Sequence, residues 1–451
     1  MVKAYKLHKI SGISAGIILF ILAVSGFFLD HDKWGFLYTT TFSSVPSYIK
    51  NSEKRLFNAY YKDIENPHHI IVGGNRGLFE SFNDGKKFSQ ISSLQIFAII
   101  PFQKQLYLAT SDGIYSYNIQ ILKRVALQSQ YITSLSISQN KIIAVKDKEK
   151  LIVLDRKSLM LINKTVVKIQ KEELQEDIKL SRLIRDLHYG RGLFDGNVSL
   201  FINDYGALIL TFLALSGYII WFLIKRKKAS KISRKLIKMH ANVFVIIATV
   251  PLFILAVTGI FLDHSSGLAK FMSSITIPHS ILPPVYNSLR SDIWSVDFDG
   301  KMYRIGNRYG IYNSKNLKDW KFENRGFAYK MIRRDNVLYI SGMGAPNRIY
   351  KENKFNILPN TPHMFRDVFF QNNSIKYFSS MQKGFPLPKF DNITLYTLLL
   401  TLHDGTFFSS WWIWVNDFAA ISFVLLAITG IIRWRIRKSI AFIKPHKYLC
   451  D

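Results

Sequence analysis

Six of the eleven histidines recur at matched positions in the two halves of the sequence. An imidazole can bind a transition metal or exchange a proton near neutral pH, so paired histidines are the first candidates for chemistry. The only cysteine is Cys450, which excludes cysteine-held clusters, intramolecular disulfides and covalently attached haem. Any metal chemistry must therefore use histidine and carboxylate. The matched pairs are His8 with His240, His31 with His264, and His188 with His403.

These histidines belong to longer repeated phrases. Residues 25–31 read SGFFLDH and residues 258–264 read TGIFLDH. The phrase LHYG at 187–190 returns as LHDG at 402–405, and 17 positions separate Asp204 from Trp221 just as they separate Asp417 from Trp434. The pattern predicts two copies of one unit, each made of a span, an outer domain and a second span.

Imidazole is the natural axial ligand of non-covalently held b-type haem, and facing helices can supply two such ligands. His8 and His31 lie about 35 Å apart along one helix, slightly more than the roughly 30 Å apolar core of a bilayer. We therefore expect one histidine at each membrane face. A lone histidine at a membrane boundary is usually inert, whereas recurrence in pairs favours ligation of one or two haems. The cytoplasmic layer contains His8 and His240, and the periplasmic layer contains His31, His264, His188 and His403.

Residues near these histidines allow two interpretations each. Gly12 and Gly16 follow His8 by four and eight positions, which leaves a smooth helix face for a flat macrocycle. The same spacing suits a Gly-x-x-x-Gly helix contact. Asp30 and Asp263 could accept hydrogen bonds that orient an imidazole, or could be solvated residues at helix ends.

Four apolar stretches are long enough to cross a membrane. The first resembles a signal peptide, but its apolar run is longer than usual and a similar run recurs inside the chain. We therefore expect it to stay as a membrane anchor. The stretches are Ile10 to Leu29, Phe201 to Ile224, Val243 to Leu262 and Trp411 to Ile432.

The net charge of +29 is concentrated beside these stretches. Three short segments, at the N-terminus, at 225–238 and after the fourth stretch, hold 17 basic residues and one acid. The positive-inside rule places all three in the cytoplasm and the long connections outside, in the periplasm of a bacterium. This distribution argues against a nucleic-acid partner and for the lipid bilayer.

The two long connections contain sequence patterns typical of β-strands. Residues 71–79 (IVGGNRGLF), 108–116 (LATSDGIYS) and 305–312 (IGNRYGIY) each read as a strand, a glycine turn and a strand. Repeated hairpins of this kind resemble β-propeller blades, with room for about three in each connection. The two inserts could close into one ring, form two small sheets, or be unrelated β-rich domains.

The predicted fold is therefore a membrane α-helical four-span bundle, a duplicated two-span unit, with two periplasmic β-rich, propeller-like inserts. The expected boundaries are 1–31 for transmembrane helix 1, 32–180 for the first β-rich domain, 181–224 for a periplasmic helix and transmembrane helix 2, 225–239 for a basic cytoplasmic loop, 240–264 for transmembrane helix 3, 265–395 for the second β-rich domain, 396–434 for a periplasmic helix and transmembrane helix 4, and 435–451 for a basic cytoplasmic tail.

The repeated motifs resemble those of the PepSY-associated transmembrane proteins, bacterial inner-membrane proteins that include ferric-siderophore reductases. The resemblance rests on the His8-Lys9 start of the first span with its Ser-Gly exit, and on Leu-His-x-Gly before a span with a Ser/Thr-Gly-x-x-x-Trp exit. It covers the four spans. The inserts depart from the family because no PepSY domain is recognisable in them. The resemblance implies that His8, His240, His188 and His403 are the preferred axial ligands, with His31 and His264 as alternatives.

The resulting hypothesis is a b-type haem protein, a ferric-reductase-like transmembrane oxidoreductase, that moves electrons across the inner membrane. No G-x-G-x-x-G fingerprint marks a nucleotide domain, so the donor would be quinol or a cytoplasmic reductase. The acceptor would be a periplasmic ferric chelate, such as a siderophore, or a redox protein. Two alternatives remain. One is an accessory or electron-donating partner of a periplasmic metalloenzyme, for example a copper respiratory reductase, and the other is a non-redox scaffold or sensor.

Overall fold

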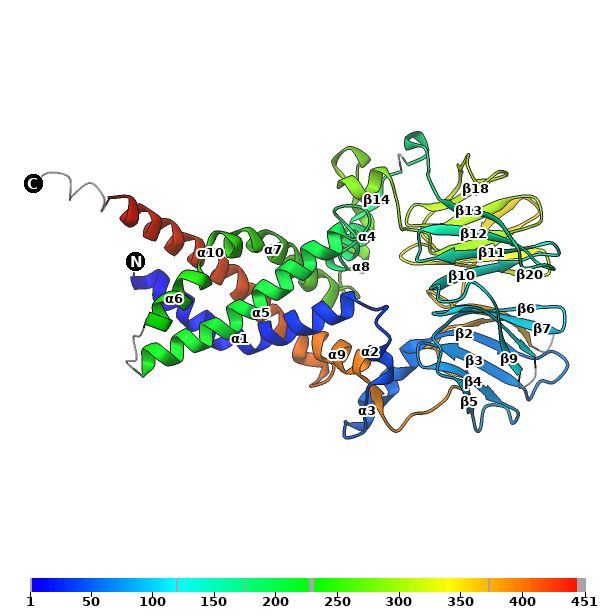
Figure 1. Cartoon of the computed structure of the whole chain (residues 1–451), viewed down its shortest axis with the longest axis horizontal. Coiled ribbons are helices and arrows are strands. Elements are labelled where there is room, and N and C mark those ends of the chain that lie inside the picture. The colour runs from blue at the N-terminus through cyan, green and yellow to red at the C-terminus, as the bar shows by residue number, and fades with distance from the viewer. Residues whose placement is uncertain (1, 119–120, 175, 227–230, 372–373, 444–451) are drawn as a thin grey trace, which may run out of the picture. The chain divides into compact units, whose positions relative to one another are not determined.

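The computed structural model divides into a helical unit and a β unit, which alternate along the chain (Figure 1). The helical unit contains residues 1–37, 179–275 and 394–451, and the β unit contains residues 38–178 and 276–393. Parts of the predicted cytoplasmic loop and tail, together with Cys450, lie outside the described residues. The structure describes residues 2–118, 121–174, 176–226, 231–371 and 374–443.

Four long apolar helices form the frame of the helical unit: α1 (Val2–Asp30), α5 (Val198–Lys225), α7 (Val243–Asp263) and α10 (Ile413–Ile443). Each forms all or most of a stretch that is long and apolar enough to cross a membrane, the fourth stretch beginning in the preceding 3-10 turn, and each predicted span lies within such a stretch. The prediction of four long apolar helices is therefore confirmed, and the chain is a multi-pass membrane protein with four candidate spans. The stretches are Ala4–Asp30, Val198–Lys225, Val243–Asp263 and Ser410–Ile436.

The four helices pack in a ring, because α1 and α7 each contact both α5 and α10. Small residues line the centre of this ring: Ala15 on α1, Ala248 on α7 and Ala419 on α10 are fully buried. Small side chains let helix backbones approach closely where lipid supplies no hydrophobic driving force. Larger residues, including Leu19 and Phe423, fill the rest of this core.

Short helices bring the candidate histidines to the frame. Helix α4 (Leu180–His188) packs on α7, α9 (Leu395–His403) packs on α1, and α6 (Lys231–His240) packs on α5. Each ends at one of the predicted histidines. The remaining helices are α2 (Phe36–Thr39), α3 (Ser47–Lys50), α8 (Ala269–Ser274) and the 3-10 turns η1 (Asn51–Leu56), η2 (Lys171–Leu174), η3 (His279–Ile281), η4 (Pro284–Asn287) and η5 (Ser410–Trp412).

The third span begins later than the sequence indicated. We expected it to start at His240, but that residue ends α6, and α7 starts at Val243. Asn242 is extended between the two helices, and its side chain accepts a hydrogen bond from the Val245 amide at 2.9 Å. Such an N-cap satisfies a free helix amide and starts a new helix. Part of the predicted basic loop is therefore the separate helix α6.

In the described residues of the β unit, five antiparallel four-stranded sheets and one two-stranded sheet have strands that pair in chain order. The hairpin glycines act as expected: Gly77 and Gly113 have positive φ in the turns after β3 and β7. The first insert forms three sheets: β2 (Phe57–Lys62), β3 (Ile70–Gly74), β4 (Gly77–Ser81) and β5 (Ser89–Ser92); β6 (Ile96–Phe102), β7 (Gln105–Thr110), β8 (Gly113–Asn118) and β9 (Ile121–Ala126); and β10 (Ile132–Ile137), β11 (Lys141–Lys146), β12 (Lys150–Asp155) and β13 (Leu161–Val166). The second insert forms the other three: β16 (Ser295–Phe298), β17 (Tyr303–Gly306), β18 (Gly310–Ser314) and β19 (Lys321–Arg325); β20 (Ala328–Arg334), β21 (Val337–Gly342), β22 (Arg348–Lys351) and β23 (Lys354–Ile357); and β24 (Asp367–Gln371) with β25 (Ser374–Phe378). Short strands β1 (Thr41–Phe42), β14 (Ile178–Lys179), β15 (Thr276–Ile277) and β26 (Ile393–Thr394) lie where the chain passes between the units.

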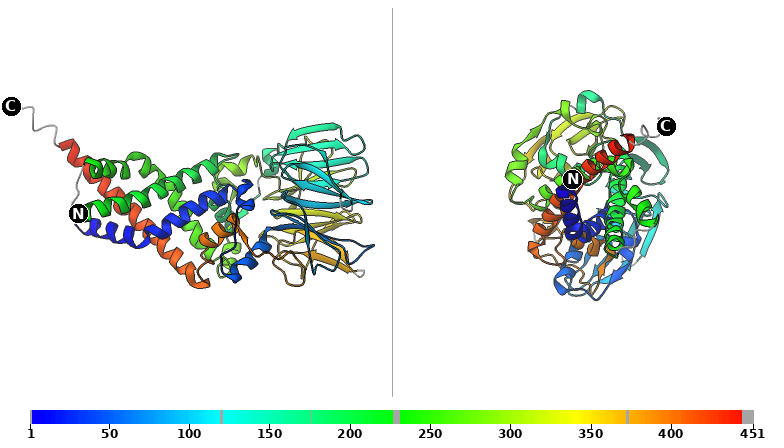
Figure 2. Two further views of the ribbon diagram at one scale, coloured as in Figure 1. Left: turned by 60° about the horizontal axis from the view of Figure 1, so that its bottom comes forward. Right: turned by 90° about the vertical axis from the view of Figure 1, so that its left-hand side faces the viewer.

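The six sheets close into one ring. Their first strands contact one another in the order β2, β6, β10, β16, β20, β24 and back to β2. Three sheets come from each insert, so the two inserts together form a single six-sheet propeller rather than two separate domains (Figure 2). This outcome is the ring closure that the sequence left open.

Two seams join the inserts. At the first, the Ser134 and Ser136 hydroxyls accept hydrogen bonds from the β16 amides of Val296 (3.2 Å) and Phe298 (3.1 Å). At the second, the buried Asp367 carboxylate accepts a hydrogen bond from the Tyr60 amide at 3.2 Å. Buried polar groups of one insert thus find their partners on the other, and neither insert alone completes the propeller.

Candidate functional site

Two of the predicted histidines face each other at one end of the helical unit. His8 lies on α1 and His240 at the end of α6. Their ring centres are 6.4 Å apart and their planes cross at 86°. We call this pair the inner pair.

A second pair, the outer pair, is formed by His188 and His403, the last residues of α4 and α9. Their ring centres are 6.1 Å apart. The carbonyls of the two helix ends are held in the same way: the Asn203 amide donates to the His188 carbonyl and the Asn416 amide to the His403 carbonyl, both at 3.1 Å. Burial, and then the neighbouring His403, lower the pKa of His188 to about 3, so the ring is neutral.

Both spacings suit two imidazoles on opposite sides of one metal. A metal–imidazole bond is about 2 Å long and the ring centre lies about 1 Å behind the bonded nitrogen, so such ring centres lie roughly 6 Å apart. The inner and outer pairs, at 6.4 and 6.1 Å, meet this requirement. In the part of the chain that the structure describes, no group of three or more His, Cys, Asp or Glu side chains could hold a metal ion. The residues fit a bis-histidine haem site, in which the macrocycle supplies the other ligands.

Every one of the four histidines rests on a Ser-Gly or Thr-Gly pair of a spanning helix. The ring Nδ1 lies within hydrogen-bonding distance of the hydroxyl, and the following glycine faces the ring Cε1. A β-carbon at any of these glycines would lie between 3.2 and 3.7 Å from that atom. The contacts are His8 on Thr429 (2.9 Å) and Gly430, His240 on Ser216 (2.7 Å) and Gly217, His188 on Thr258 (3.1 Å) and Gly259, and His403 on Ser25 (2.9 Å) and Gly26.

The inner pair opens on a cavity of about 580 Å³. Its walls are mostly apolar, and basic side chains including Lys9, Lys225 and Arg433 line it together with Tyr5 and Trp221. A cavity of this size is typical of cofactor sites, which combine apolar walls with a few charged groups. A flat apolar macrocycle with carboxylate substituents matches that lining.

Both interpretations of the α1 glycines hold in part. Gly12 and Gly16 line the inner cavity. Gly16 also receives the Tyr218 ring of α5, since a β-carbon there would lie 2.8 Å from that ring. The Tyr218 hydroxyl donates to the Ile13 carbonyl at 2.9 Å, which fixes the contact between the two helices.

Comparison with models of known protein families identifies the family of this chain. The model of the PepSY-associated TM region matches residues 138–437, more than half of the chain. The chain belongs to the PepSY-associated TM region family. The match includes His188, His240 and His403 of the two pairs. No curated protein matches the chain.

Solved structures resemble this PepSY-associated TM protein only distantly. PorZ, a surface component of the type-IX secretion system of Porphyromonas gingivalis, is 9% identical with a TM-score of 0.34, over 70% of this chain and 29% of PorZ. The computationally designed Ika8 protein is 9% identical with a TM-score of 0.33, over 72% of this chain and 80% of Ika8. YCF48 from Cyanidioschyzon merolae is 10% identical with a TM-score of 0.30, over 72% of this chain and 71% of YCF48. At these TM-scores the likenesses carry no argument about function.

The alternative ligands, His31 and His264, are not brought together in this family member. The Nδ1 of His31 donates to the Phe27 carbonyl at 2.8 Å, and its Nε2 lies 3.6 Å from Asp204. The Nε2 of His264 lies 2.7 Å from Asp417. Each ring therefore faces a carboxylate instead of another imidazole.

Asp30 is linked to the outer pair. Its carboxylate accepts a hydrogen bond from Asn203 at 3.3 Å, and the same amide donates to the His188 carbonyl. Asp30 is therefore joined to the end of α4 through Asn203. The Asp acts on the end of α4 and does not touch the imidazole.

The two pairs are closer together than the His8 to His31 separation suggested. Seventeen positions separate His8 from Ser25, which contacts the His403 ring, and both residues lie on α1. At the helical rise, the inner and outer levels are thus about 25 Å apart, compared with about 35 Å between His8 and His31.

The propeller has a smaller cavity of about 300 Å³, lined by Phe102, Lys141, Phe298 and Arg333 among others. The Lys141 ammonium donates to the Tyr303 hydroxyl at 2.7 Å and lies 5.2 Å from the Phe298 ring centre. The cavity thus combines aromatic walls with the Lys141 cation, which lies within cation–π range of Phe298.

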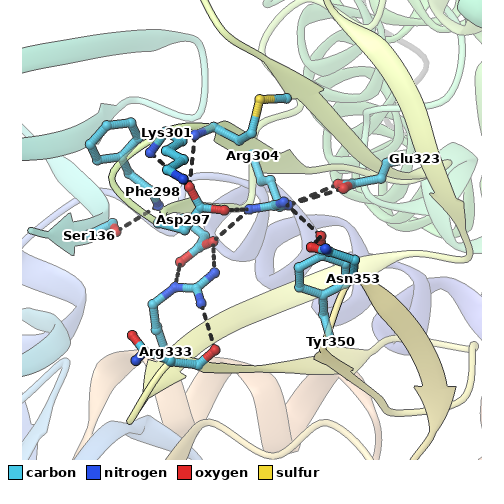
Figure 3. Close-up of polar contacts among 12 residues, drawn as sticks. Ser136, Asp297, Phe298, Lys301, Arg304, Glu323, Arg333, Tyr350 and Asn353 are labelled. Atoms are coloured by element: carbon cyan, nitrogen blue, oxygen red, sulfur yellow. Dashed lines mark hydrogen bonds and ion pairs between the residues drawn. The ribbon is translucent and has the colours of Figure 1, made fainter.

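The carboxylates beside that cavity are already engaged (Figure 3). Arg304 lies 2.6 Å from Asp299 and 3.0 Å from Glu323, and Asp297 pairs with Arg304 at 3.6 Å and with Arg333 at 2.5 Å. Arg304 and Asp297 are almost fully buried. Fully paired buried charges of this kind are structural, and we assign them no chemistry.

A second charged group in the propeller surrounds His69. Its Nε2 lies 2.7 Å from Glu80 and its Nδ1 lies 3.3 Å from Asp63, with only 5% of the residue exposed. Burial opposes protonation of the ring, but the hydrogen bonds to Glu80 and Asp63 outweigh burial and raise its pKa. When it is protonated, the ring pairs with both carboxylates and stabilises the β3–β4 hairpin.

Proposed function

We propose that this chain is a bacterial inner-membrane b-type haem protein that moves electrons across the membrane to a periplasmic acceptor, a ferric chelate. One observation carries the proposal: two pairs of histidines face each other with ring centres 6.4 and 6.1 Å apart at two levels of one helical bundle. When bound, a b-type haem supplies an iron that alternates between the ferric and ferrous states.

The residues of the chain provide what such a carrier needs. The paired imidazoles on the short helices and on α1 would hold the iron of such a haem. The apolar core between the levels, built around Leu19, Leu252 and Phe423, excludes water and ions from the path. The spacing of about 25 Å between the two levels is shorter than the separation of about 35 Å between His8 and His31.

The direction of transfer rests on the basic segments. Lys225, Arg226 and the basic face of α6 lie at the inner end of the bundle, as expected for the cytoplasmic side. The inner pair would then receive electrons from quinol or a cytoplasmic reductase. A quinol that is oxidised releases two electrons and two protons, so two ferric chelates would be reduced to the ferrous state for each quinol.

The acceptor proposal rests on the propeller cavity. Lys141 beside the aromatic ring of Phe298 offers a cation and an aromatic wall to an anionic chelate. The affinity of the purified protein for ferric hydroxamate and catecholate chelates, compared with that of Lys141→Met, tests this part. Equal affinity of the two proteins would argue against the cavity as the binding place.

The visible spectrum of the purified protein tests the haem assignment. We expect b-type absorption bands in protein from haem-replete cells, partial loss of the bands in His8→Ala and in His403→Ala, and full loss in the double variant. His31→Ala is the matched control, because His31 is a boundary histidine that faces a carboxylate. Colourless, stable protein would contradict the proposal.

A further inference from the structure

We propose that the hydroxyls of Ser25, Ser216, Thr258 and Thr429 are positioning residues that fix the tautomer of the four paired histidines and lower the redox potential of the iron they bind. The inference deepens the proposed function and rests on it. The sequence singled out the Ser-Gly and Thr-Gly exits of the spans only as family motifs, and the structure places all four against imidazoles.

The tautomer follows from counting protons. Each hydroxyl donates its one proton to a backbone carbonyl one helical turn earlier, so toward the histidine it can only accept. The imidazole Nδ1 must then carry a hydrogen, which leaves the lone pair on Nε2 free for a metal. The donor distances are 2.6 Å from Ser25 to Ile21, 2.6 Å from Ser216 to Phe212, 2.7 Å from Thr258 to Ile254 and 2.7 Å from Thr429 to Leu425.

Burial strengthens these contacts. Ser25 is 1% exposed and Thr429, the most exposed of the four residues, is 5% exposed. Water therefore does not compete for the Nδ1 hydrogen. The glycine after each hydroxyl leaves room for the ring to lie directly against the helix. Hydroxyl and glycine thus form one cradle that sets both the position and the rotation of the ring.

In all four contacts the hydroxyl and the histidine come from opposite halves of the chain. Ser25 holds His403, Thr258 holds His188 and Thr429 holds His8. Ser216 holds His240 across the link between α5 and α6. Each pair is therefore supported by one serine and one threonine. The arrangement repeats at both levels.

A simpler explanation is that serine and threonine in spanning helices commonly return a hydrogen bond to the preceding turn. Thr211 shows that behaviour, since its hydroxyl donates to the Ala207 carbonyl at 2.8 Å. Among the described residues no imidazole hydrogen-bonds to this hydroxyl, whereas each of the four cradle hydroxyls has an imidazole partner. Thr211 therefore serves as the matched control.

The expected effect has a definite sign. A hydrogen bond accepted from Nδ1–H makes the imidazole a stronger donor to the metal, as outer hydrogen bonds do for other metal-bound histidines. A stronger donor favours the ferric state and lowers the midpoint potential. Removing the hydroxyls should shift the midpoint potential upward. A tenfold change in the stabilisation of the ferric state relative to the ferrous state corresponds to about 59 mV for one electron.

The test is a potentiometric titration of the full chain in detergent, followed by its visible spectrum. We expect Ser25→Ala with Thr258→Ala to raise the potential of one haem only, and Ser216→Ala with Thr429→Ala to raise that of the other. The hydroxyl-preserving exchanges Ser25→Thr with Thr258→Ser, and the control Thr211→Ala, should leave both potentials unchanged.

The remaining outcomes of the titration distinguish this inference from the haem proposal. Unshifted potentials in both alanine pairs would overturn the inference and leave the haem proposal standing, whereas wild-type protein without haem would overturn the haem proposal itself. If the alanine pairs lose haem, retention of haem by the hydroxyl-preserving exchange supports the inference. Equal loss of haem in both kinds of variant would contradict it.

Discussion

Gly26 offers a graded test of the outer pair. A β-carbon at this position would lie 3.2 Å from the His403 Cε1 and 3.8 Å from its Nδ1. The best separation of two carbons is about 3.5 to 4.0 Å, so Gly26→Ala requires a shift of only a few tenths of an ångström. Gly26→Leu places three more carbons where the imidazole lies, an overpacking that costs about 1–3 kcal/mol if the ring stays. We therefore expect alanine to be tolerated and leucine to displace His403.

The assay is the haem content per chain, measured after purification from haem-replete cells. With a haem at each level, Gly26→Leu should retain about half of the wild-type content, because the inner pair rests on Gly217 and Gly430 instead. Gly35→Leu is the control, since a β-carbon there meets nothing within 4 Å. Full haem content and an unchanged spectrum in Gly26→Leu would refute the placement of His403 against α1.

Three further predictions concern the supports of the site and the propeller. Asn416→Leu leaves the His403 carbonyl without its side-chain donor at a cost of about 1–3 kcal/mol, so haem should bind the outer pair roughly tenfold or more weakly in a competition with apomyoglobin. Arg304→Met removes the cation that pairs with buried carboxylates, at a cost of about 3–5 kcal/mol in the free energy of unfolding. The melting temperature of the β unit, followed by its β-sheet circular dichroism signal, should fall by about 10 °C. A shift below about 2 °C would contradict the buried ion pairing of Arg304. The raised pKa of His69 means that its ion pairs stabilise the fold fully below the unfolded pKa of about 6.5 and are lost as the pH rises through the folded pKa, so the loss of stability in His69→Gln should be larger at about pH 5.5 than at about pH 9. An equal loss at both pH values would refute the charge pairing with Glu80.

Much of the helical unit could be predicted because its signals are local. Twenty apolar residues in a row identify a spanning helix whatever its neighbours are, and all four spans were found in this way. The break between His240 and Val243 was missed, because it depends on the conformation of Asn242 and on a single cap hydrogen bond. Apolar pattern alone does not register such a break.

The propeller was predicted in part for the same reason. The glycine hairpins around Gly77 and Gly113 could be read from the sequence, since each needs only a local turn. The closure of the ring could not, because it depends on contacts between strands more than two hundred positions apart, such as Tyr60 with Asp367.

The histidines show both the strength and the limit of reading repeats. Matched positions indicated which histidines to consider, but not which would face each other. His31 resembled His188 by its position at the membrane boundary, and only the fold shows that it faces Asp204. The Ser-Gly and Thr-Gly exits carried the missing information, because a hydroxyl and a glycine at each level mark the surface on which an imidazole lies.

The haem-to-chain ratio of the full protein tests the central claim most directly. A pyridine haemochrome measurement on purified chain should give b-type haem at two per chain, with one lost in His8→Ala and the other in His403→Ala. Protein that is stable, folded and free of haem when purified from haem-replete cells would contradict the account.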